Sequence, residues 1–240
     1  MKLNNIYTTF NGEVNTKGIG SPCIFLRLQG CPIRCYAKTM GILCDTPEAL
    51  KKSKDKDTPK SIIHKLNQER ERTGLSFITL TGGDPLWNDE NDLHELFTLF
   101  KDNGYHVSVE TSGTISWLPY RKYTNVDWVI DYKGASTGID SKLNLLLNSE
   151  HLNSLSDRDF IKFVVANNVN DYNEVVNFVK STDTKAKIAV GTFWGSNTIS
   201  TLSLFKLLKH DKLLSRVTIN MQTHKLVVRP DYNATIPTDI

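Results

Sequence analysis

This 240-residue sequence has no long apolar run, no cleavable leader and no strong excess of one charge. No apolar stretch is long enough to cross a bilayer, and the mean hydropathy is −0.32. The N-terminal segment MKLNNIYTTFNGEV holds one lysine and no apolar core, so it does not resemble a signal peptide. The net charge of +3 is too small to indicate nucleic-acid binding by itself. These absences predict a cytoplasmic protein that contacts neither a membrane nor nucleic acid directly.

Cysteine is also scarce, except in one short segment. All four cysteines fall within 22 residues, and none occurs in the 196 residues that follow Cys44. A secreted protein stapled by disulfides would spread its cysteines through the fold. Clustered thiols in a reducing compartment indicate instead a metal site or a catalytic thiol.

Strand-like and helix-like segments alternate along most of the chain. Apolar runs of strand length occur at residues 23–28, 75–80, 105–109, 126–131, 160–165, 187–193 and 217–221. Helical spacing of apolar residues lies between them, for example at 59–72 and 89–103. This alternation predicts an α/β fold with a mainly parallel sheet and right-handed crossovers. Because a closed eight-unit barrel usually needs about 250 residues, we expect a single domain over residues 1–240 that forms a partial, open (β/α) barrel.

The cysteines follow the first predicted strand, on a loop of about residues 30–47. Three residues separate Cys31 from Cys35, and eight more precede Cys44. Three thiolates on one loop can hold three irons of a 4Fe-4S cluster and leave the fourth iron open. A tetrahedral zinc site that adds Cys23 is an alternative, although the spacings match neither of the usual CxxC pairs. Cys23 lies inside the strand, where we expect a small buried residue.

Six short segments, in order along the chain, resemble those of one enzyme family. The CxxxC pair resembles the cysteine motif of the radical S-adenosylmethionine (SAM) superfamily, which is usually CxxxCxxC. The six segments resemble motifs of one family within it, the 7-carboxy-7-deazaguanine synthases. They are FNGEV (10–14), FLRLQGCPIRC (25–35), CDT (44–46), TGGDP (81–85), ETSGT (110–114) and MQTHK (221–225). The resemblance covers nearly the whole chain and implies the radical SAM type of partial barrel.

Three departures from the family pattern stand out. The third cysteine follows after eight residues rather than two, as if six residues were inserted, so the loop must bulge outward at a small closure cost. Asn11 stands where the family usually has Gln, and Asp84 stands where it has Glu. None of these changes removes a thiolate or a charge.

The resemblance implies three groups of site residues. The metal ligands would be Cys31, Cys35 and Cys44 for the 4Fe-4S cluster and the Thr46 hydroxyl for Mg²⁺. SAM would contact Gly82, Gly83, Asp84, Glu110, Ser112 and Lys133. The substrate would contact Asn11, Glu13, Arg27, Gln222 and His224, the last two at the end of the final predicted strand.

Residue chemistry supports several of these roles. The two glycines let the backbone approach a ligand closely. The planar fork of Arg27 suits a carboxylate, and strand alternation places Arg27 on the same side as Phe25 and Gln29. The carboxylate of Glu13 can accept two adjacent N–H donors of a 2-amino-4-oxo pterin ring.

The family resemblance also implies a reaction and partners. The enzyme would convert 6-carboxy-5,6,7,8-tetrahydropterin to 7-carboxy-7-deazaguanine in 7-deazapurine (queuosine-type) biosynthesis. It would be reduced by a partner such as flavodoxin or ferredoxin and would form a homodimer. One alternative is another small radical SAM enzyme, such as a glycyl-radical activase, although FNGEV and MQTHK argue against it. A second alternative is a non-catalytic zinc or iron–sulfur protein.

Overall fold

A computed structural model describes residues 1–37, 42–44, 46–50, 56–194 and 198–227. Its centre is an eight-stranded sheet in the order β1-β2-β5-β6-β7-β8-β9-β10. The strands are β1 (Leu3–Phe10), β2 (Pro22–Leu28), β5 (Phe77–Gly82), β6 (His106–Thr111), β7 (Val126–Tyr132), β8 (Phe160–Val165), β9 (Lys187–Thr192) and β10 (Val217–Asn220). β1 pairs with β2 in antiparallel fashion, and every other pair is parallel. β1 and β10 are the edges of the described sheet, which is therefore open, as predicted.

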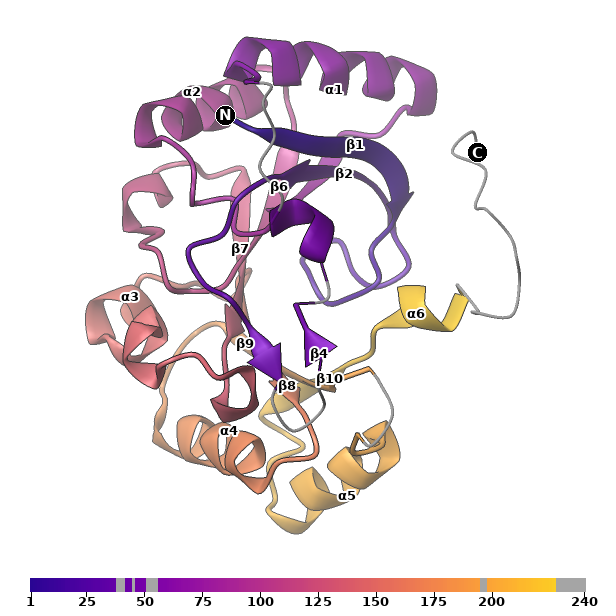
Figure 1. Cartoon of the computed structure of the whole chain (residues 1–240). Helices are drawn as coiled ribbons and strands as arrows, with labels where there is room; N and C mark the ends of the chain where they lie inside the picture. The colour runs from indigo at the N-terminus through magenta and orange to yellow at the C-terminus, as the bar shows by residue number, and fades with distance from the viewer. Residues whose placement is uncertain (38–41, 45, 51–55, 195–197, 228–240) are drawn as a thin grey trace.

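Helices cover the convex face of this sheet (Figure 1). The longer ones are α1 (Pro59–Thr73), α2 (Glu90–Asp102), α4 (Val169–Ser181) and α5 (Thr201–His210), and α3 (Ser149–Asn153) is short. The short helix α6 (Thr223–Val227) lies instead beside the loop that follows β1. The helix ends follow local chemistry. Thr58 caps α1 by accepting a hydrogen bond from the Ser61 N–H at 3.1 Å, as expected from its position before Pro59. No described helix is long and apolar enough to span a bilayer.

Two predictions about the strands are wrong. The first strand is β1, which precedes the predicted strand at 23–28 and runs antiparallel to it. Its sequence, LNNIYTTF, carries too many polar residues to resemble an apolar run. The last strand ends at Asn220, so Gln222 lies beyond it and His224 lies on α6.

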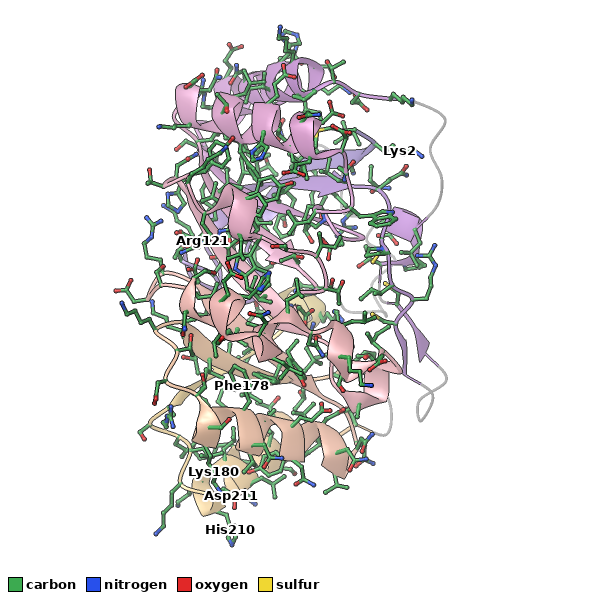
Figure 2. The ribbon with its side chains drawn as sticks, turned by 90° about the vertical axis from the view of Figure 1, so that its left-hand side faces the viewer. Lys2, Arg121, Phe178, Lys180, His210 and Asp211 are labelled. Carbon is green, nitrogen blue, oxygen red and sulfur yellow. The ribbon has the colours of Figure 1, made fainter. Side chains whose placement is uncertain are left out.

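The two faces of the sheet have different partners. On the convex face, fully buried side chains such as Leu80, Trp128 and Ile130 pack against the helices in the main hydrophobic core. In the side view, α4 carries Phe178, and Asp211 lies beyond it at the end of α5 (Figure 2). The Tyr172 hydroxyl donates to Asp211 at 2.6 Å and ties these two helices together.

The concave face is partly filled by the loop between β1 and β2. Val14 packs there in a small separate cluster with Val129, Phe160 and Ala189. Two hydrogen bonds fix the loop: the Val14 N–H donates to Asn220 Oδ1 at 3.0 Å, and the Thr16 hydroxyl donates to Asp127 at 2.7 Å. Because these contacts lie toward the amino ends of β7 and β8, the carboxyl ends of the strands remain open to a cavity.

Candidate functional site

Strand register brings polar side chains together on the concave face. Arg27 of β2 is the register partner of Thr81 in β5, and Asp131 of β7 is the partner of Lys162 in β8. The alternate residues of the same strands pack in the convex core. A cavity lies at the carboxyl ends of these strands, the edge at which open α/β sheets bind ligands. Its walls include Glu13, the three loop cysteines, Thr46, the glycine pair, Glu110, Ser112, Asp131, Lys133 and Lys162.

Two short strands of a hairpin lie between the second and third loop cysteines, among the residues that the structure describes. They are β3 (Tyr36–Ala37) and β4 (Ile42–Leu43), and Tyr36 pairs with Leu43 in antiparallel register. Cys35 and Cys44 immediately flank this pair. A hairpin returns the chain to its starting point, so eight intervening residues still leave Cys44 beside Cys35.

The three loop thiols fit an iron–sulfur cluster. Cys31, Cys35 and Cys44 all line the cavity, and none of them is part of a disulfide bond. Among the described residues, no three Cys, His, Asp or Glu side chains approach closely enough to hold a single metal ion. A 4Fe-4S cluster does not need such close approach of its ligands. Each thiolate binds a different iron, so the three thiols surround the cluster and do not meet at one point. Cys23 lies elsewhere, fully buried in β2.

The two glycines after β5 lie against the backbone of the cysteine loop. A Cβ atom at Gly82 would overlap the carbonyl of Leu28, and one at Gly83 would overlap the carbonyl of Gly30. The Asp84 N–H donates to the Gly30 carbonyl at 2.8 Å. Glycine is therefore needed here for the close approach of two protein segments. Both glycines also line the cavity, and their contact with SAM stays a prediction.

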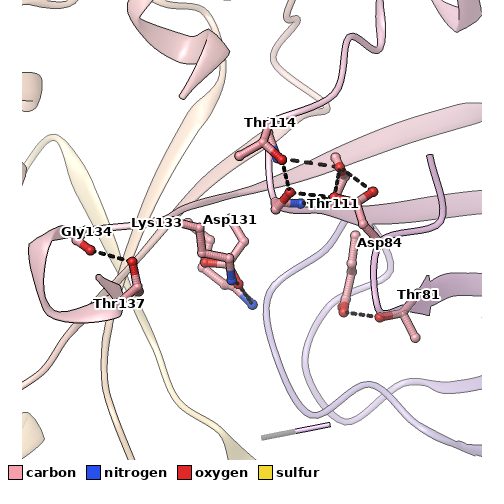
Figure 3. A network of polar contacts seen from close by, with 12 residues as sticks. Thr81, Asp84, Thr111, Thr114, Asp131, Lys133, Gly134 and Thr137 are labelled. Atoms are coloured by element: carbon pink, nitrogen blue, oxygen red, sulfur yellow. Dashed lines mark hydrogen bonds and ion pairs between the residues drawn. The ribbon is translucent and has the colours of Figure 1, made fainter. Parts of the chain in front are cut away.

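Asp84 forms a closed network with the end of β6 (Figure 3). Its carboxylate accepts hydrogen bonds from the Ser112 N–H at 2.9 Å, the Ser112 hydroxyl at 2.5 Å and the Thr111 hydroxyl at 3.0 Å. The Leu86 N–H adds a fourth donor at 3.0 Å. Burial raises the pKa of Asp84, and these hydrogen bonds only partly oppose the shift. Asp84 and Ser112, both predicted to contact SAM, thus bind each other.

Glu13 lies at the centre of a second, charged network. Its Oε2 accepts from Lys162 Nζ at 2.7 Å and from Asn220 Nδ2 at 3.1 Å, and its Oε1 accepts from Gln222 Nε2 at 2.6 Å. Burial opposes ionisation, but Lys162 and the amide donors lower the pKa of Glu13 to about 2. Glu13 is therefore a carboxylate at neutral pH.

This network continues toward the predicted SAM side of the cavity. Lys162 Nζ lies 3.5 Å from Asp131 Oδ2, and that oxygen accepts from Lys133 Nζ at 2.9 Å. Glu110 lines the same space, and Thr81 donates to it at 3.2 Å. Burial raises the pKa of Glu110 against the opposing charge of Lys162.

The FNGEV and MQTHK segments meet although about 200 residues separate them. The Thr223 N–H donates to the Gly12 carbonyl at 2.9 Å, and the ring of His224 lies so close to Gly12 that a Cβ there would overlap it. His224 lines a second cavity that adjoins the first, together with Glu13, Arg27, Thr46 and Asn11. Each of these residues was predicted to contact the substrate or Mg²⁺.

Arg27 already has a carboxylate partner within the chain. Its Nη1 lies 2.7 Å from Glu48 Oε1, and its Nη2 donates to the Tyr7 hydroxyl at 3.3 Å. A substrate carboxylate would thus bind Arg27 beside Glu48 or take the place of Glu48. The Nε of Arg27 and the Oε1 of Gln222 are buried without a hydrogen-bond partner in the described structure. Such atoms are rare, and a polar ligand would satisfy them.

Asn11 is engaged inside the protein. Its Oδ1 accepts from the Thr79 hydroxyl at 2.8 Å and from the Cys23 thiol at 3.1 Å, and its Nδ2 donates to Asn15 at 3.1 Å. The side chain is almost completely buried. Its contact with substrate stays a prediction, and its visible role is to fix the loop that carries Glu13.

Sequence reasoning missed Lys162, Asp131 and Glu48. A lysine within the apolar strand FIKFVV and an aspartate within VDWVID are signals of buried charge that needs a partner. Their proximity, however, follows from the pairing of β7 with β8, which the sequence pattern alone does not give. Glu48 follows CDT on a short 3-10 helix (Pro47–Leu50) and carried no signal of its own.

Comparisons with known proteins agree with the geometry. Residues 16–134 match the family model of the 4Fe-4S single cluster domain. The chain is 30% identical to a 7-carboxy-7-deazaguanine synthase of Methanospirillum hungatei over 82% of its own length and 74% of that protein. It is 28% identical to a synthase of the same name from Clostridium acetobutylicum, over 91% and 94% of the two chains.

The fold is similar to that of solved structures. Streptococcus suis SuiB bound to S-adenosylmethionine superposes with a TM-score of 0.55 at 15% identity, over 81% of this chain. The matched region spans about half the length of the SuiB chain. At this level of identity the likeness concerns the fold alone.

Proposed function

The chain belongs to the 7-carboxy-7-deazaguanine synthase family, and we propose that it converts 6-carboxy-5,6,7,8-tetrahydropterin to 7-carboxy-7-deazaguanine and ammonia. One observation carries the proposal: Glu13 of FNGEV and Gln222 of MQTHK bind each other at a cavity that is also lined by Cys35 and Cys44. A polar ring held there would lie beside the predicted cluster site. The alternatives do not account for this meeting of distant segments.

We assign Cys31, Cys35 and Cys44 to the cluster. When bound, the cluster and SAM supply an electron and a 5′-deoxyadenosyl radical. Glu110 and Lys133 are charged groups on the same cavity wall and suit the amino and carboxylate groups of SAM. The glycine pair and the Asp84–Ser112 network hold the backbone of this wall in place.

The substrate side is built from Glu13, Gln222, Arg27 and His224. The ionised Glu13 accepts N–H donors of the pterin ring, and Gln222 Oε1 and Arg27 Nε offer buried polar atoms to the same ligand. Asn11 keeps the Glu13 loop in place. Thr46 lines both adjoining cavities, and we propose that its hydroxyl binds Mg²⁺ beside the substrate carboxylate.

Further parts of the proposal concern setting and partners. We infer a single radical SAM domain that works in the cytoplasm as a homodimer and takes electrons from a flavodoxin or ferredoxin. None of the four cysteines is part of a disulfide bond, which supports a reducing compartment. The product would feed 7-deazapurine biosynthesis.

Anaerobic reconstitution with iron and sulfide tests the cofactor assignment. We expect a brown protein with about four irons that cleaves SAM when reduced. Cys44→Ala should lose the iron, while Cys23→Ala should keep it. Tight zinc binding without iron uptake would refute the assignment.

The substrate is tested next, with 6-carboxy-5,6,7,8-tetrahydropterin, SAM, Mg²⁺ and a reductant. Chromatography should detect 7-carboxy-7-deazaguanine. Reductive cleavage of SAM without any deazaguanine product would instead indicate another small radical SAM enzyme.

A further inference from the structure

Lys162 is a buried cation for which the proposed reaction has not yet required a role. It lies in the middle of β8, on the concave face, and only 8% of its side chain is exposed. Its ammonium contacts Glu13 at 2.7 Å and Asp131 at 3.5 Å. These two acids come from the loop after β1 and from β7, so Lys162 connects elements that are far apart in the sequence.

The surroundings of Lys162 explain why a cation is needed there. Glu13, Glu110 and Asp131 all border one cavity, and the other buried cation, Lys133, is already paired with Asp131. Three carboxylates without a second cation would favour protonation, because burial and mutual repulsion both disfavour their charged forms. A protonated Glu13 would lose part of its capacity to accept hydrogen bonds. Lys162 thus keeps Glu13 in the form that accepts N–H donors.

The position of Glu13 depends on the same contact. Glu13 lies on a loop, and its Oε2 is held by Lys162 from one side and by Asn220 from another. The continuation through Asp131 to Lys133 links this loop to the opposite wall of the cavity. The two walls are those that we assign to the substrate and to SAM.

Resting on the proposed function, we propose that Lys162 is a positioning residue that holds the Glu13 carboxylate toward the pterin ring and joins it to the Asp131–Lys133 pair on the SAM side. It touches neither reacting group and acts through these acids. Two consequences follow. Loss of the charge weakens pterin binding, and it also loosens the coupling between SAM cleavage and product formation.

The test compares Lys162→Met, which keeps an unbranched side chain one atom shorter and removes the charge, with Lys162→Arg, which keeps the charge. Lys187→Met is the matched control, because Lys187 is exposed at the start of the neighbouring strand β9. Pterin affinity is measured by fluorescence titration of the cluster-loaded protein without reductant. Iron content and the ratio of 5′-deoxyadenosine to deazaguanine product are measured on the same samples.

We expect K162M to weaken pterin binding by about tenfold to a hundredfold, as for a lost hydrogen bond to a charged group. K162R should lose no more than about threefold, and K187M should match the wild type. K162M should also release more 5′-deoxyadenosine per product, with unchanged iron content. A K162M protein with wild-type affinity and coupling would overturn the proposal, and so would K162R and K162M with equal losses.

A double-mutant cycle with Glu13→Gln shows whether Lys162 acts through Glu13. In the E13Q background, K162M should change affinity by no more than about twofold, because the partner charge is already absent. If the affinity loss of the double variant equals the product of the losses of E13Q and K162M, the proposal is overturned. K162M leaves Glu13 as an unpaired buried acid and could fail to fold, whereas E13Q/K162M lacks both charges and should fold. If K162M does not fold, the decisive comparison is between K162R and E13Q. An affinity loss in K162R as large as that in E13Q would then overturn the proposal.

This outcome is separable from that of the proposed function. A wild-type protein that forms no deazaguanine refutes the function itself. A wild-type protein that forms product, with an unaffected K162M variant, refutes only the role of Lys162.

Discussion

Two buried carboxylates near the same cavity have opposite environments. Asp84 is surrounded only by neutral donors, and burial raises its pKa. Glu13 is paired with Lys162, and its pKa falls to about 2 although burial opposes its ionisation as well. The hydrogen bonds of Asp84 join two loop segments of the protein, whereas those of Glu13 lie on the wall of a cavity.

The difference separates the framework of the site from its recognition surface. Neutral donors around Asp84 saturate its oxygens and fix the turn after β5 against the end of β6, so little capacity remains for a ligand. Glu13 keeps a full negative charge beside unsatisfied atoms of Arg27 and Gln222. Removal of each carboxylate should therefore affect different properties.

The largest expected effect is on folding, from Asp84→Ala. This change leaves the buried N–H groups of Ser112 and Leu86 without acceptors, each costing about 1–3 kcal/mol. We expect a loss of about 4 kcal/mol in the free energy of unfolding, measured by chemical denaturation. A loss below about 1 kcal/mol would mean that the Asp84 network does not hold the framework.

Gly83→Ala should have the next largest effect, because its new Cβ would overlap the Gly30 carbonyl beside Cys31. We expect destabilisation by about 3 kcal/mol and reduced iron retention. Gly104→Ala is the control: nothing lies within 4 Å of an added Cβ there, so its cost comes from the positive φ of Gly104 and not from overlap. It should cost only about 1 kcal/mol and keep the iron. Equal effects of the two changes would contradict close packing of the cysteine loop.

Acid should change the stability contributions of Glu13 and Asp84 in opposite directions. The lowered pKa of Glu13 gives stability that is complete above the unfolded value of 4.5 and is lost as pH falls toward 2. The raised pKa of Asp84 acts in the opposite direction, so its contribution falls as pH rises above 3.8. As pH rises from about 2 to 4.5, we expect the stability cost of Glu13→Gln to grow and then to level off, whereas that of Asp84→Asn shrinks as pH rises above 3.8.

Denaturation of the two variants and the wild type at several pH values measures these slopes. The protein without cluster is the appropriate sample, because acid also releases iron. Parallel slopes for the two variants would remove the distinction between the carboxylates.

The smallest expected effect is that of Cys23→Ala. Its thiol is fully buried and donates to Asn11, so its removal should cost about 1 kcal/mol. Pterin affinity should fall by less than about threefold, because Asn11 keeps its bond from Thr79. A large loss of iron in this variant would return Cys23 to the set of cluster ligands.

Much of the fold could be predicted because its parallel strands are short apolar runs. The run at 160–165 matches β8, and the capping pattern at Thr58 matches the start of α1. β1 escaped detection because its stability comes from pairing with β2 and not from its own polar sequence. For the same reason, the contact of Lys162 with Asp131 depends on a register between strands that are far apart in the sequence.

The motifs indicated which residues gather at the site but not what each one contacts. The sequence suggested that Arg27 awaits a ligand, yet the structure gives it Glu48 as a partner. It suggested that Asp84 and Ser112 face SAM, yet they bind each other. Short-range patterns reveal residue types and strand ends, whereas hydrogen-bond partners are decided by packing across the whole fold.

The hairpin between Cys35 and Cys44 bears on how related chains are found. Each added rung of an antiparallel ladder brings two residues and leaves the ends of the ladder where they were. A search pattern with a fixed interval before the third cysteine would pass over such a chain, although its cluster loop is complete. A pattern that allows an even number of extra residues between the second and third cysteines, and requires CDT at the third cysteine, would detect chains of this kind.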